Sequence, residues 1–310
     1  MVATLASASA PEQPAAPPSR LGSAGGVALA IERFGAAAAP GLVFAHGFGQ
    51  TRRAWSGTAG TLAGEGWHCL TADSRGHGDS GWNADGDYDF PQFVDDLILL
   101  AHHAAQPPAP GLPILIGASM GGLLGLVAQA ACAPFRALVL VDITPRWENA
   151  GVERILAFMR AHPDGFGSVE EAAEAIDHYL PHRRERNRAR TDRPERLRQL
   201  LVTHADGRLR WHWDPRMLDR IAADSERQQA HLLEAARNIR VPTLLISGAR
   251  SDIVSDATIE EFLACVPHAE HVSVPHATHM VVGDRNDAFT DAVRRFIEPL
   301  RPGGTTRSTS

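Results

Sequence analysis

Cysteines and long apolar stretches are both scarce in this sequence. The 310 residues include only three cysteines, Cys69, Cys132 and Cys265, which are far apart and show no C-x-x-C spacing. An odd number of widely spaced cysteines is typical of small core residues in a reduced protein, and not of a disulfide framework. No apolar run approaches the roughly 20 residues that a helix needs to cross a bilayer. We therefore expect a cytoplasmic protein that does not bind a membrane.

Positive charge is in deficit as well, and lysine is absent. All 30 basic residues are arginines against 36 acidic residues, which gives a net charge of -6. This balance gives no electrostatic reason to expect a nucleic acid or an anionic membrane as a partner. With 44% hydrophobic and 21% charged residues, the chain can bury a substantial core. Its length suits one α/β domain with an insertion better than two independent domains, and its oligomeric state stays open.

The order of the patterns divides the chain into a core, an insertion and two ends. Residues 1–20 are rich in Ala, Pro and Ser, and we expect them to be disordered, as we expect residues 301–310 to be flexible. Strand-like runs alternate with helical stretches over 21–146 and again over 233–300, which predicts a mostly parallel sheet with helices on both faces. Residues 147–232 are helix-rich and show no buried strand pattern. They predict an α-helical lid inserted into the core.

Three local signals shape the predicted lid. Ser168, with Glu171 three residues later, forms a capping box that predicts the start of a helix. Asp206-Gly207 marks a turn. The arginine-dense stretch 183–198 could bind an anion, but acidic residues interleave with the arginines, which favours a solvated helix.

A serine between two glycines gives the first chemical signal. Ser119 lies in Gly117-Ala118-Ser119-Met120-Gly121, after the apolar run 113–116 and before the apolar stretch 123–128. The small residues let two chain segments pass close to a serine on a sharp turn from a strand to a helix. A catalytic serine needs such a turn. The alternative interpretation is an ordinary glycine turn before a packed helix.

Further segments follow the pattern of one family. Residues 42–49 form an apolar strand that runs into His-Gly-Phe-Gly, and residues 70–80 form a strand that runs into Asp-x-Arg-Gly-x-Gly-x-Ser. The strand-like runs 243–248 and 272–275 lead to an aspartate and a histidine. In this order the chain resembles the α/β-hydrolase family over about residues 25–300. The resemblance implies an α/β-hydrolase fold with a helical lid, of the serine esterase, lactonase or perhydrolase branch.

The resemblance assigns the nucleophile, the acid and the base to Ser119, Asp252 and His279. A serine hydroxyl is a weak nucleophile at neutral pH, so a base must take its proton and a carboxylate must fix the tautomer of that base. Two alternatives stay open. His276 competes with His279, and Asp142 competes with Asp252 because some relatives place the carboxylate after the preceding strand. The other interpretation of Asp142 is a structural residue in the turn Asp-Ile-Thr-Pro.

Acyl transfer also creates an oxyanion, which preorganised N–H donors must stabilise by hydrogen bonds. The resemblance implies that the backbone N–H groups of Phe48 and Met120 form this oxyanion hole. We interpret His46 as a hydrogen-bonding residue that holds the loop of Phe48. Asp73 and Arg75 are predicted to brace the neighbouring turn.

The expected substrate follows from the nucleophile and the aromatic residues. Ser119 stands where relatives that open epoxides or displace halides have a carboxylate, and His-Gly-Phe-Gly is similar to the versions in esterases, lactonases and cofactor-free perhydrolases. We expect a small-molecule ester or lactone and water as reactants. Perhydrolysis, C–C bond hydrolysis and a role as a ligand receptor with little turnover are the alternatives. Five aromatic residues are predicted to bind an apolar or aromatic group, although those in the lid could instead pack it on the core: Phe48, Trp147, Phe166, Trp211 and Trp213.

Patterns that would indicate a cofactor or a metal are incomplete. Gly76-His-Gly-Asp-Ser-Gly81 matches the dinucleotide fingerprint, but a turn sequence follows where a helix would have to hold the pyrophosphate. His102 and His103 are adjacent and lack the i, i+4 spacing of a helical zinc pair. We expect neither a cofactor nor a metal.

Overall fold

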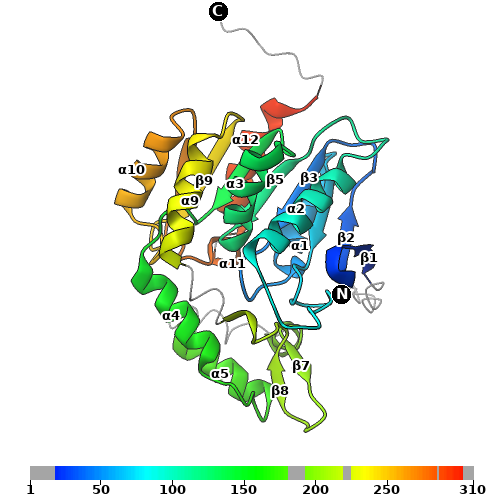
Figure 1. The fold of residues 1–310 in the computed structure, drawn as a ribbon, viewed down its shortest axis with the longest axis vertical. Helices are drawn as coiled ribbons and strands as arrows, with labels where there is room; N and C mark the ends of the chain where they lie inside the picture. Colours follow the sequence, from blue (N-terminus) through cyan, green and yellow to red (C-terminus); the bar gives the residue numbers. More distant parts are fainter. Residues whose placement is uncertain (1–17, 181–192, 219–224, 285, 303–310) are drawn as a thin grey trace, which may run out of the picture.

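The structure is a computed structural model that describes residues 18–180, 193–218, 225–284 and 286–302. Its centre is an eight-stranded sheet (Figure 1). In spatial order the strands are β1 (Ser19–Gly22), β2 (Ala28–Phe34), β4 (His68–Ala72), β3 (Gly41–Ala45), β5 (Ile114–Ala118), β6 (Ala137–Val141), β9 (Thr243–Gly248) and β10 (Glu270–Val274). Only the pairs β1–β2 and β2–β4 are antiparallel. The expectation of a mostly parallel sheet is confirmed.

Helices cover both faces of the sheet because its strands are apolar on both sides. In β3, Val43 and Ala45 belong to one core, whereas Leu42 and Phe44 belong to the other. Side chains alternate between the faces of a strand, so such a strand is buried only between two layers. The first core is covered by α2 (Phe90–Ala104), α3 (Met120–Cys132), α9 (Ser225–Arg237) and α10 (Asp256–Cys265). The second is covered by α1 (Ser56–Gly64), α11 (Val281–Asp284) and α12 (Asn286–Ile297), with the short 3-10 helices η2 (Arg52–Trp55) and η4 (Glu298–Leu300). A third 3-10 helix, η1 (Ala24–Gly26), lies between β1 and β2 and buries no residue.

Between β6 and β9 the chain forms a segment that we call the insertion, residues 147–232. Its described part holds α4 (Asn149–Arg160), α5 (Val169–Tyr179), α7 (Arg193–Arg198) and an antiparallel pair, β7 (Leu201–Thr203) and β8 (Leu209–Trp211), and gives no strand to the main sheet. Figure 1 shows α4, α5 and the β7–β8 hairpin beyond one end of the core. The hairpin was not predicted, because strands of three residues are too short to show an alternating pattern.

Local predictions within the insertion have mixed outcomes. The Ser168 hydroxyl accepts a hydrogen bond from the Glu171 N–H at 3.2 Å, so Ser168 caps the start of α5 as predicted. The reciprocal half of the box differs, because the Glu171 carboxylate accepts from the Gly167 N–H at 2.6 Å. The predicted turn at Asp206-Gly207 lies in the loop between β7 and β8. The predicted boundary at residue 232 falls inside α9, which packs on α3 of the core. Of the arginine-dense stretch, residues 183–192 lie outside the described residues.

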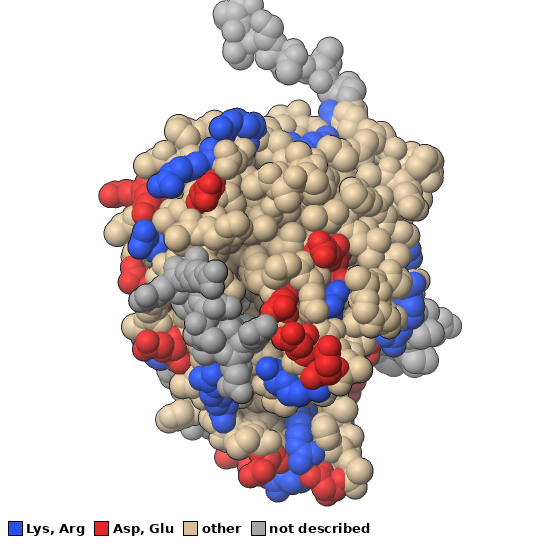
Figure 2. Space-filling model, in the orientation of Figure 1, with Lys and Arg blue, Asp and Glu red and all other residues tan. Residues whose placement is uncertain are grey.

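The two terminal segments predicted to be disordered or flexible, residues 1–20 and 301–310, include a few residues that make defined contacts. Residues 1–17 and 303–310 lie outside the described residues. Ser19 and Arg20 pair with β2 as part of β1, because the edge of the sheet offers them backbone partners. Arg301 lies over the Trp67 ring, 4.4 Å from its centroid. On the face shown in Figure 2, the coloured arginine side chains are interspersed with acidic ones and form no continuous basic surface.

Candidate active site

The predicted site residues lie on loops at one edge of the sheet. Strands β3, β5, β6, β9 and β10 run parallel, so their carboxyl ends meet at the same edge. In open α/β sheets, ligands bind outside this edge. The loops carry His46 after β3, Ser119 after β5, Asp142 after β6, Asp252 after β9 and His279 after β10.

Ser119 lies on the strained turn that its flanking glycines predict. It separates β5 from α3, and its φ of 48° and ψ of -120° are rare for a residue other than glycine. A Cβ atom at Gly117 would lie 2.6 Å from the carbonyl oxygen of Gly121, and one at Gly121 would lie 2.3 Å from that of Ala45. Only glycine fits at both positions. The chain therefore turns sharply and leaves Ser119 half-buried at the edge.

His279 is paired with Asp142. The Nδ1 atom of His279 lies 2.8 Å from Oδ2 of Asp142. The carboxylate is fully buried and also accepts hydrogen bonds from the Gly248 N–H and the Ser251 hydroxyl, both at 2.6 Å. Because these donors fix the carboxylate, it holds the proton of His279 on Nδ1 and leaves Nε2 as an acceptor.

The prediction that Asp252 partners His279 is wrong. The Asp252 carboxylate accepts a hydrogen bond from Arg154 of α4 at 2.6 Å, and both side chains are exposed. Strands β6 and β9 are neighbours, so both aspartates start from the same edge of the sheet. The loop after β9 directs Ser251 to the carboxylate of Asp142 and Asp252 to the solvent side. The alternative acid, Asp142, is the one beside the histidine.

Ser119 and His279 flank the same loop, residues 46–50. A Cβ atom at Gly47 would lie 3.1 Å from Cβ of Ser119, and Nε2 of Gln50 lies 3.5 Å from Sδ of Met280, the residue after His279. The Ser119 hydroxyl and Nε2 of His279 form no hydrogen bond with any described residue. Hydrogen bonds between such groups are often long before a substrate binds. The rival base, His276, is exposed at a turn.

In the loop 46–50, the Phe48 N–H meets no acceptor among the described residues. Within the described residues, neither the N–H of Phe48 nor that of Met120 donates a hydrogen bond. The Gly47 carbonyl accepts hydrogen bonds from Nδ1 of His46 at 2.8 Å and from the Gln50 N–H at 3.1 Å. Burial lowers the pKa of His46. The interpretation of His46 as a residue that holds this loop is confirmed.

Ser119 adjoins an apolar cavity of about 160 Å³ between the core and the insertion. Helix α4 contributes Val152, Ile155 and Leu156, whose i, i+3, i+4 spacing places them on one face of the helix. The polar residues of the lining are Ser119, Tyr88, Asp89 and Gln228, and the apolar ones include Phe90, Phe93, Leu123, Ile143 and Ile253.

Two of the five predicted binding aromatics, Phe48 and Trp147, line this cavity. The other three do not, and the prediction is wrong for them. Trp211 stacks on Trp213 with 5.0 Å between the ring centroids, and Phe166 meets Trp211 edge-on at 4.9 Å. All three rings are buried. They pack the insertion on the core, as the alternative interpretation held. Trp211 ends β8, and Trp213, two residues later, stacks on it and packs beside Gly49 of the core.

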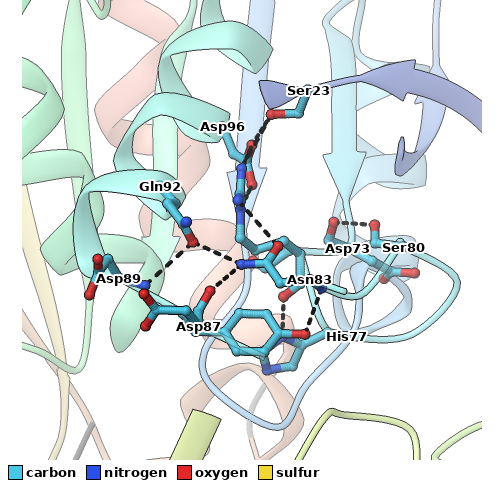
Figure 3. A network of polar contacts seen from close by, with 12 residues as sticks. Ser23, Asp73, His77, Ser80, Asn83, Asp87, Asp89, Gln92 and Asp96 are labelled. Carbon is cyan, nitrogen blue, oxygen red and sulfur yellow. Dashed lines mark hydrogen bonds and ion pairs between the residues drawn. The ribbon is translucent and has the colours of Figure 1, made fainter. Parts of the chain in front are cut away.

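A buried polar network holds the segment between β4 and α2 (Figure 3). The end of this segment, at Tyr88 and Asp89, lines the cavity. Arg75 donates two hydrogen bonds to Asp96 of α2, each at 2.7 Å, and Asp73 accepts one from the Arg52 N–H at 2.7 Å. The bracing roles predicted for Asp73 and Arg75 are therefore confirmed. Residues 76–81 form turns and do not start a helix, so the dinucleotide pattern lacks the helix N-terminus that it requires.

A family model described as serine aminopeptidase, S33, matches residues 37–286. This span includes Ser119, Asp142 and His279. The chain is an α/β hydrolase.

The relatives of this α/β hydrolase point to one broad reaction class. It is 29% identical to 3-hydroxybutyrate-oligomer hydrolase of Cupriavidus necator over 276 residues, which are 83% of this chain and 86% of that protein. It is 28% identical to an esterase of Mycobacterium tuberculosis over 283 residues, 87% of each chain. The solved structure of E-2-(acetamidomethylene)succinate hydrolase matches with a TM-score of 0.73 and 25% identity, over 90% of this chain and 98% of that chain. The family and its esterase relatives support ester hydrolysis as the general activity.

Sequence reasoning missed the α4 face and Asp89. The spacing of Val152, Ile155 and Leu156 could have indicated a buried helix face. Asp89 gives no such signal, because an aspartate before a helix is an ordinary cap. Among the described residues, no group of three His, Cys, Asp or Glu side chains is placed to hold a metal ion, and no helix is long and apolar enough to span a membrane.

Proposed function

We propose that this α/β hydrolase is a serine hydrolase of carboxylic esters or lactones with a small to medium, apolar or aromatic acyl group. The observation that supports this most is the apolar cavity beside Ser119, at the sheet edge that also carries the His279–Asp142 pair. The esterase and oligomer hydrolase among the relatives are consistent with this class of substrate.

The proposed reaction has two half-reactions. In the first, Oγ of Ser119 attacks the carbonyl carbon while Nε2 of His279 takes the serine proton, and the oxyanion accepts hydrogen bonds from the N–H groups of Phe48 and Met120. The tetrahedral intermediate then breaks its bond to the alcohol oxygen, which receives the proton from His279. In the second, water attacks the acyl-enzyme in the same way, and the carboxylic acid leaves as the proton returns to Ser119. The Asp142 carboxylate stabilises the imidazolium that forms on His279.

The size of the cavity predicts the acyl preference. A dry cavity of about 150 Å³ in another protein holds benzene, so this one has room for a ring or a short chain. Each buried CH₂ contributes about 0.8 kcal/mol, so kcat/KM for p-nitrophenyl hexanoate should exceed that for the acetate by roughly tenfold to a hundredfold and should fall again for the laurate. Steady-state kinetics over this series tests it, with Ser119→Ala as the blank. A flat profile, or one that rises to the laurate, would contradict the assigned cavity.

Trp147 should affect large acyl groups selectively. It lines the cavity and is 8% exposed. Trp147→Ala should therefore raise KM for the hexanoate by about tenfold more than KM for the acetate, since only the longer chain loses apolar contact area. Trp147→Phe keeps a ring at this position and is the matched variant with a small effect. An equal change for both esters would show that Trp147 only packs the insertion.

Asp89 should discriminate against anionic acyl groups. Among the described residues that line the cavity, Asp89 is the only carboxylate, and none of them is an arginine or a histidine. Two like charges about 10 Å apart at an effective dielectric constant of about 20 repel each other by about 1.7 kcal/mol. This energy corresponds to a change in rate of more than tenfold. Asp89 also forms a capping box with Gln92 at the start of α2. Asparagine caps a helix as well as aspartate, so Asp89→Asn removes the charge and keeps the cap.

The measurement compares p-nitrophenyl hydrogen glutarate with the neutral valerate. Asp89→Asn should raise the ratio of their kcat/KM values by about tenfold and leave the valerate almost unchanged. A ratio that does not move would show that Asp89 acts only as a helix cap.

A further inference from the structure

His212 connects the insertion to the loop that carries Phe48. It directly follows β8 and is 2% exposed. Its Nδ1 atom lies 2.9 Å from the N–H of Gly78, and its Nε2 atom lies 3.2 Å from the carbonyl oxygen of Gly49. A backbone N–H only donates, so Nδ1 is the acceptor and Nε2 carries the proton that Gly49 accepts. Burial lowers the pKa of His212 to about 4, which keeps the ring in this neutral form at neutral pH.

Gly49 is held on its other side by a second histidine. Its N–H donates to Nε2 of His77 at 3.2 Å, and Nδ1 of His77 lies 3.1 Å from the carbonyl oxygen of Arg75. Burial lowers the pKa of His77 well below its usual value. Both polar backbone groups of Gly49 are thus bonded to neutral histidines, one from the core and one from the insertion.

These contacts determine the direction of the Phe48 N–H. The peptide that carries this N–H also carries the Gly47 carbonyl, which His46 and Gln50 hold. The carbonyl and the N–H of a trans peptide point in opposite directions, so a fixed carbonyl fixes the N–H. The Gly49 carbonyl, which His212 holds, lies in the same peptide as the Gln50 N–H, and that N–H donates to the Gly47 carbonyl. The hydrogen bond from His212 therefore helps to fix the Gly47 carbonyl and, through it, the Phe48 N–H.

The chain around His212 is docked firmly on the core. The Asp214 N–H donates to the carbonyl of Gly76 at 2.9 Å, and the Tyr88 hydroxyl donates to the Asp214 carboxylate at 2.8 Å. Trp213 packs beside Gly49 and lies 6.5 Å from Phe48, ring centroid to ring centroid. His212 therefore holds Gly49 only while this part of the insertion is seated.

We propose that His212 is a positioning residue for the oxyanion hole: by donating to the Gly49 carbonyl, it makes the direction of the Phe48 N–H depend on the docking of the insertion. The proposal rests on the proposed function, because it takes the Phe48 N–H as an oxyanion donor. It predicts that loss of this one hydrogen bond weakens the transition state and leaves substrate binding intact.

Two substitutions separate the two hydrogen bonds of His212. Asparagine places its side-chain oxygen near the former Nδ1 and keeps the bond from Gly78, but it has no atom near Nε2. Glutamine reaches the position of Nε2 with an N–H that can donate to Gly49. Removal of one oxyanion-hole donor costs about 10²–10³ in kcat, and a misdirected donor should cost part of this. His212→Asn should lower kcat for p-nitrophenyl hexanoate by about tenfold to a hundredfold with KM within about twofold, and His212→Gln should recover most of the loss.

A tetrahedral-adduct inhibitor gives the second readout. Binding of a hexyl trifluoromethyl ketone should weaken in His212→Asn by the same factor as kcat, whereas inhibition by hexanoate should not change. His231→Asn, at an exposed position of α9, is the matched control and should equal the wild type. If His212→Asn fails to fold, His77→Asn and His77→Gln make the same comparison at the Gly49 N–H, which the glutamine oxygen can accept.

Three results would overturn the proposal: an unchanged kcat in His212→Asn, the same loss in the asparagine and glutamine variants, or a change in KM alone. Ser119→Ala, measured in parallel, distinguishes a failure of the positioning role of His212 from a failure of the proposed function. If the wild type hydrolyses esters through Ser119 and His212→Asn matches it, the positioning role fails and the proposed function stands. If wild-type hydrolysis does not depend on Ser119, the proposed function fails, and the positioning role with it.

Discussion

Replacement of Ser119 by alanine is expected to lower kcat for p-nitrophenyl hexanoate by about four orders of magnitude or more, because the serine and the histidine of such a site act as one unit. The residual rate would come from the oxyanion donors and the cavity, which can still stabilise attack by water. The loss should appear in kcat, since the cavity that binds the acyl group is not altered.

A fluorophosphonate probe measures the same residue without a substrate. The wild type should be labelled and Ser119→Ala should not. Ser273→Ala, at an exposed position on β10, is the matched serine variant and should label like the wild type. Labelling of Ser119→Ala would show that another residue is the nucleophile.

Replacement of Asp142 by asparagine is expected to lower kcat by about 10⁴, the cost of the wrong histidine tautomer in a comparable triad. The amide that replaces the carboxylate can turn an N–H toward Nδ1 of His279, which would place the histidine proton on Nε2. Nε2 could then not accept the proton of Ser119. Steady-state kcat for p-nitrophenyl hexanoate measures this loss.

Asp252→Asn is the matched control for this result. It removes a carboxylate of the same type from a loop that starts at the same sheet edge, but from an exposed pair with Arg154. Exposed ion pairs contribute little to the stability of a fold, so kcat should stay within about threefold of the wild type. A larger loss in Asp252→Asn than in Asp142→Asn would return the role of the acid to Asp252.

The sequence predicted the parts of this molecule that depend on local constraints. Gly117 and Gly121 are required by close backbone contacts, so they indicated the turn of Ser119 without any knowledge of distant residues. The alternation of apolar strands and helices likewise predicted a parallel sheet covered by helices, because a strand that is buried on both faces is a nearly continuous apolar run.

The sequence could not determine which aspartate reaches His279. Asp142 and Asp252 both follow apolar strands, and the difference between them lies in the path of one loop. That path depends on Gly248, where a Cβ atom would lie 2.5 Å from the Thr278 carbonyl oxygen, and on Ser251, which donates to Asp142. The roles of the insertion aromatics were equally undetermined, since a buried tryptophan has the same sequence signature whether it packs a hairpin or lines a cavity.

The residues proposed to carry out the reaction and the residues of α4 that shape the cavity lie on separate parts of the structure. The groups proposed to make and break bonds lie at strand ends that the core fixes, whereas Val152, Ile155 and Leu156 shape the cavity from a single helix that carries none of them. At Gly151 a Cβ atom would lie 2.1 Å from the Asp252 carbonyl oxygen, so only glycine lets this helix pack against the loop after β9 at that point. Substrate range can therefore diverge through exchanges on one helix face while the chemical steps stay the same, which makes these three positions the natural starting point for redesigning what the enzyme accepts.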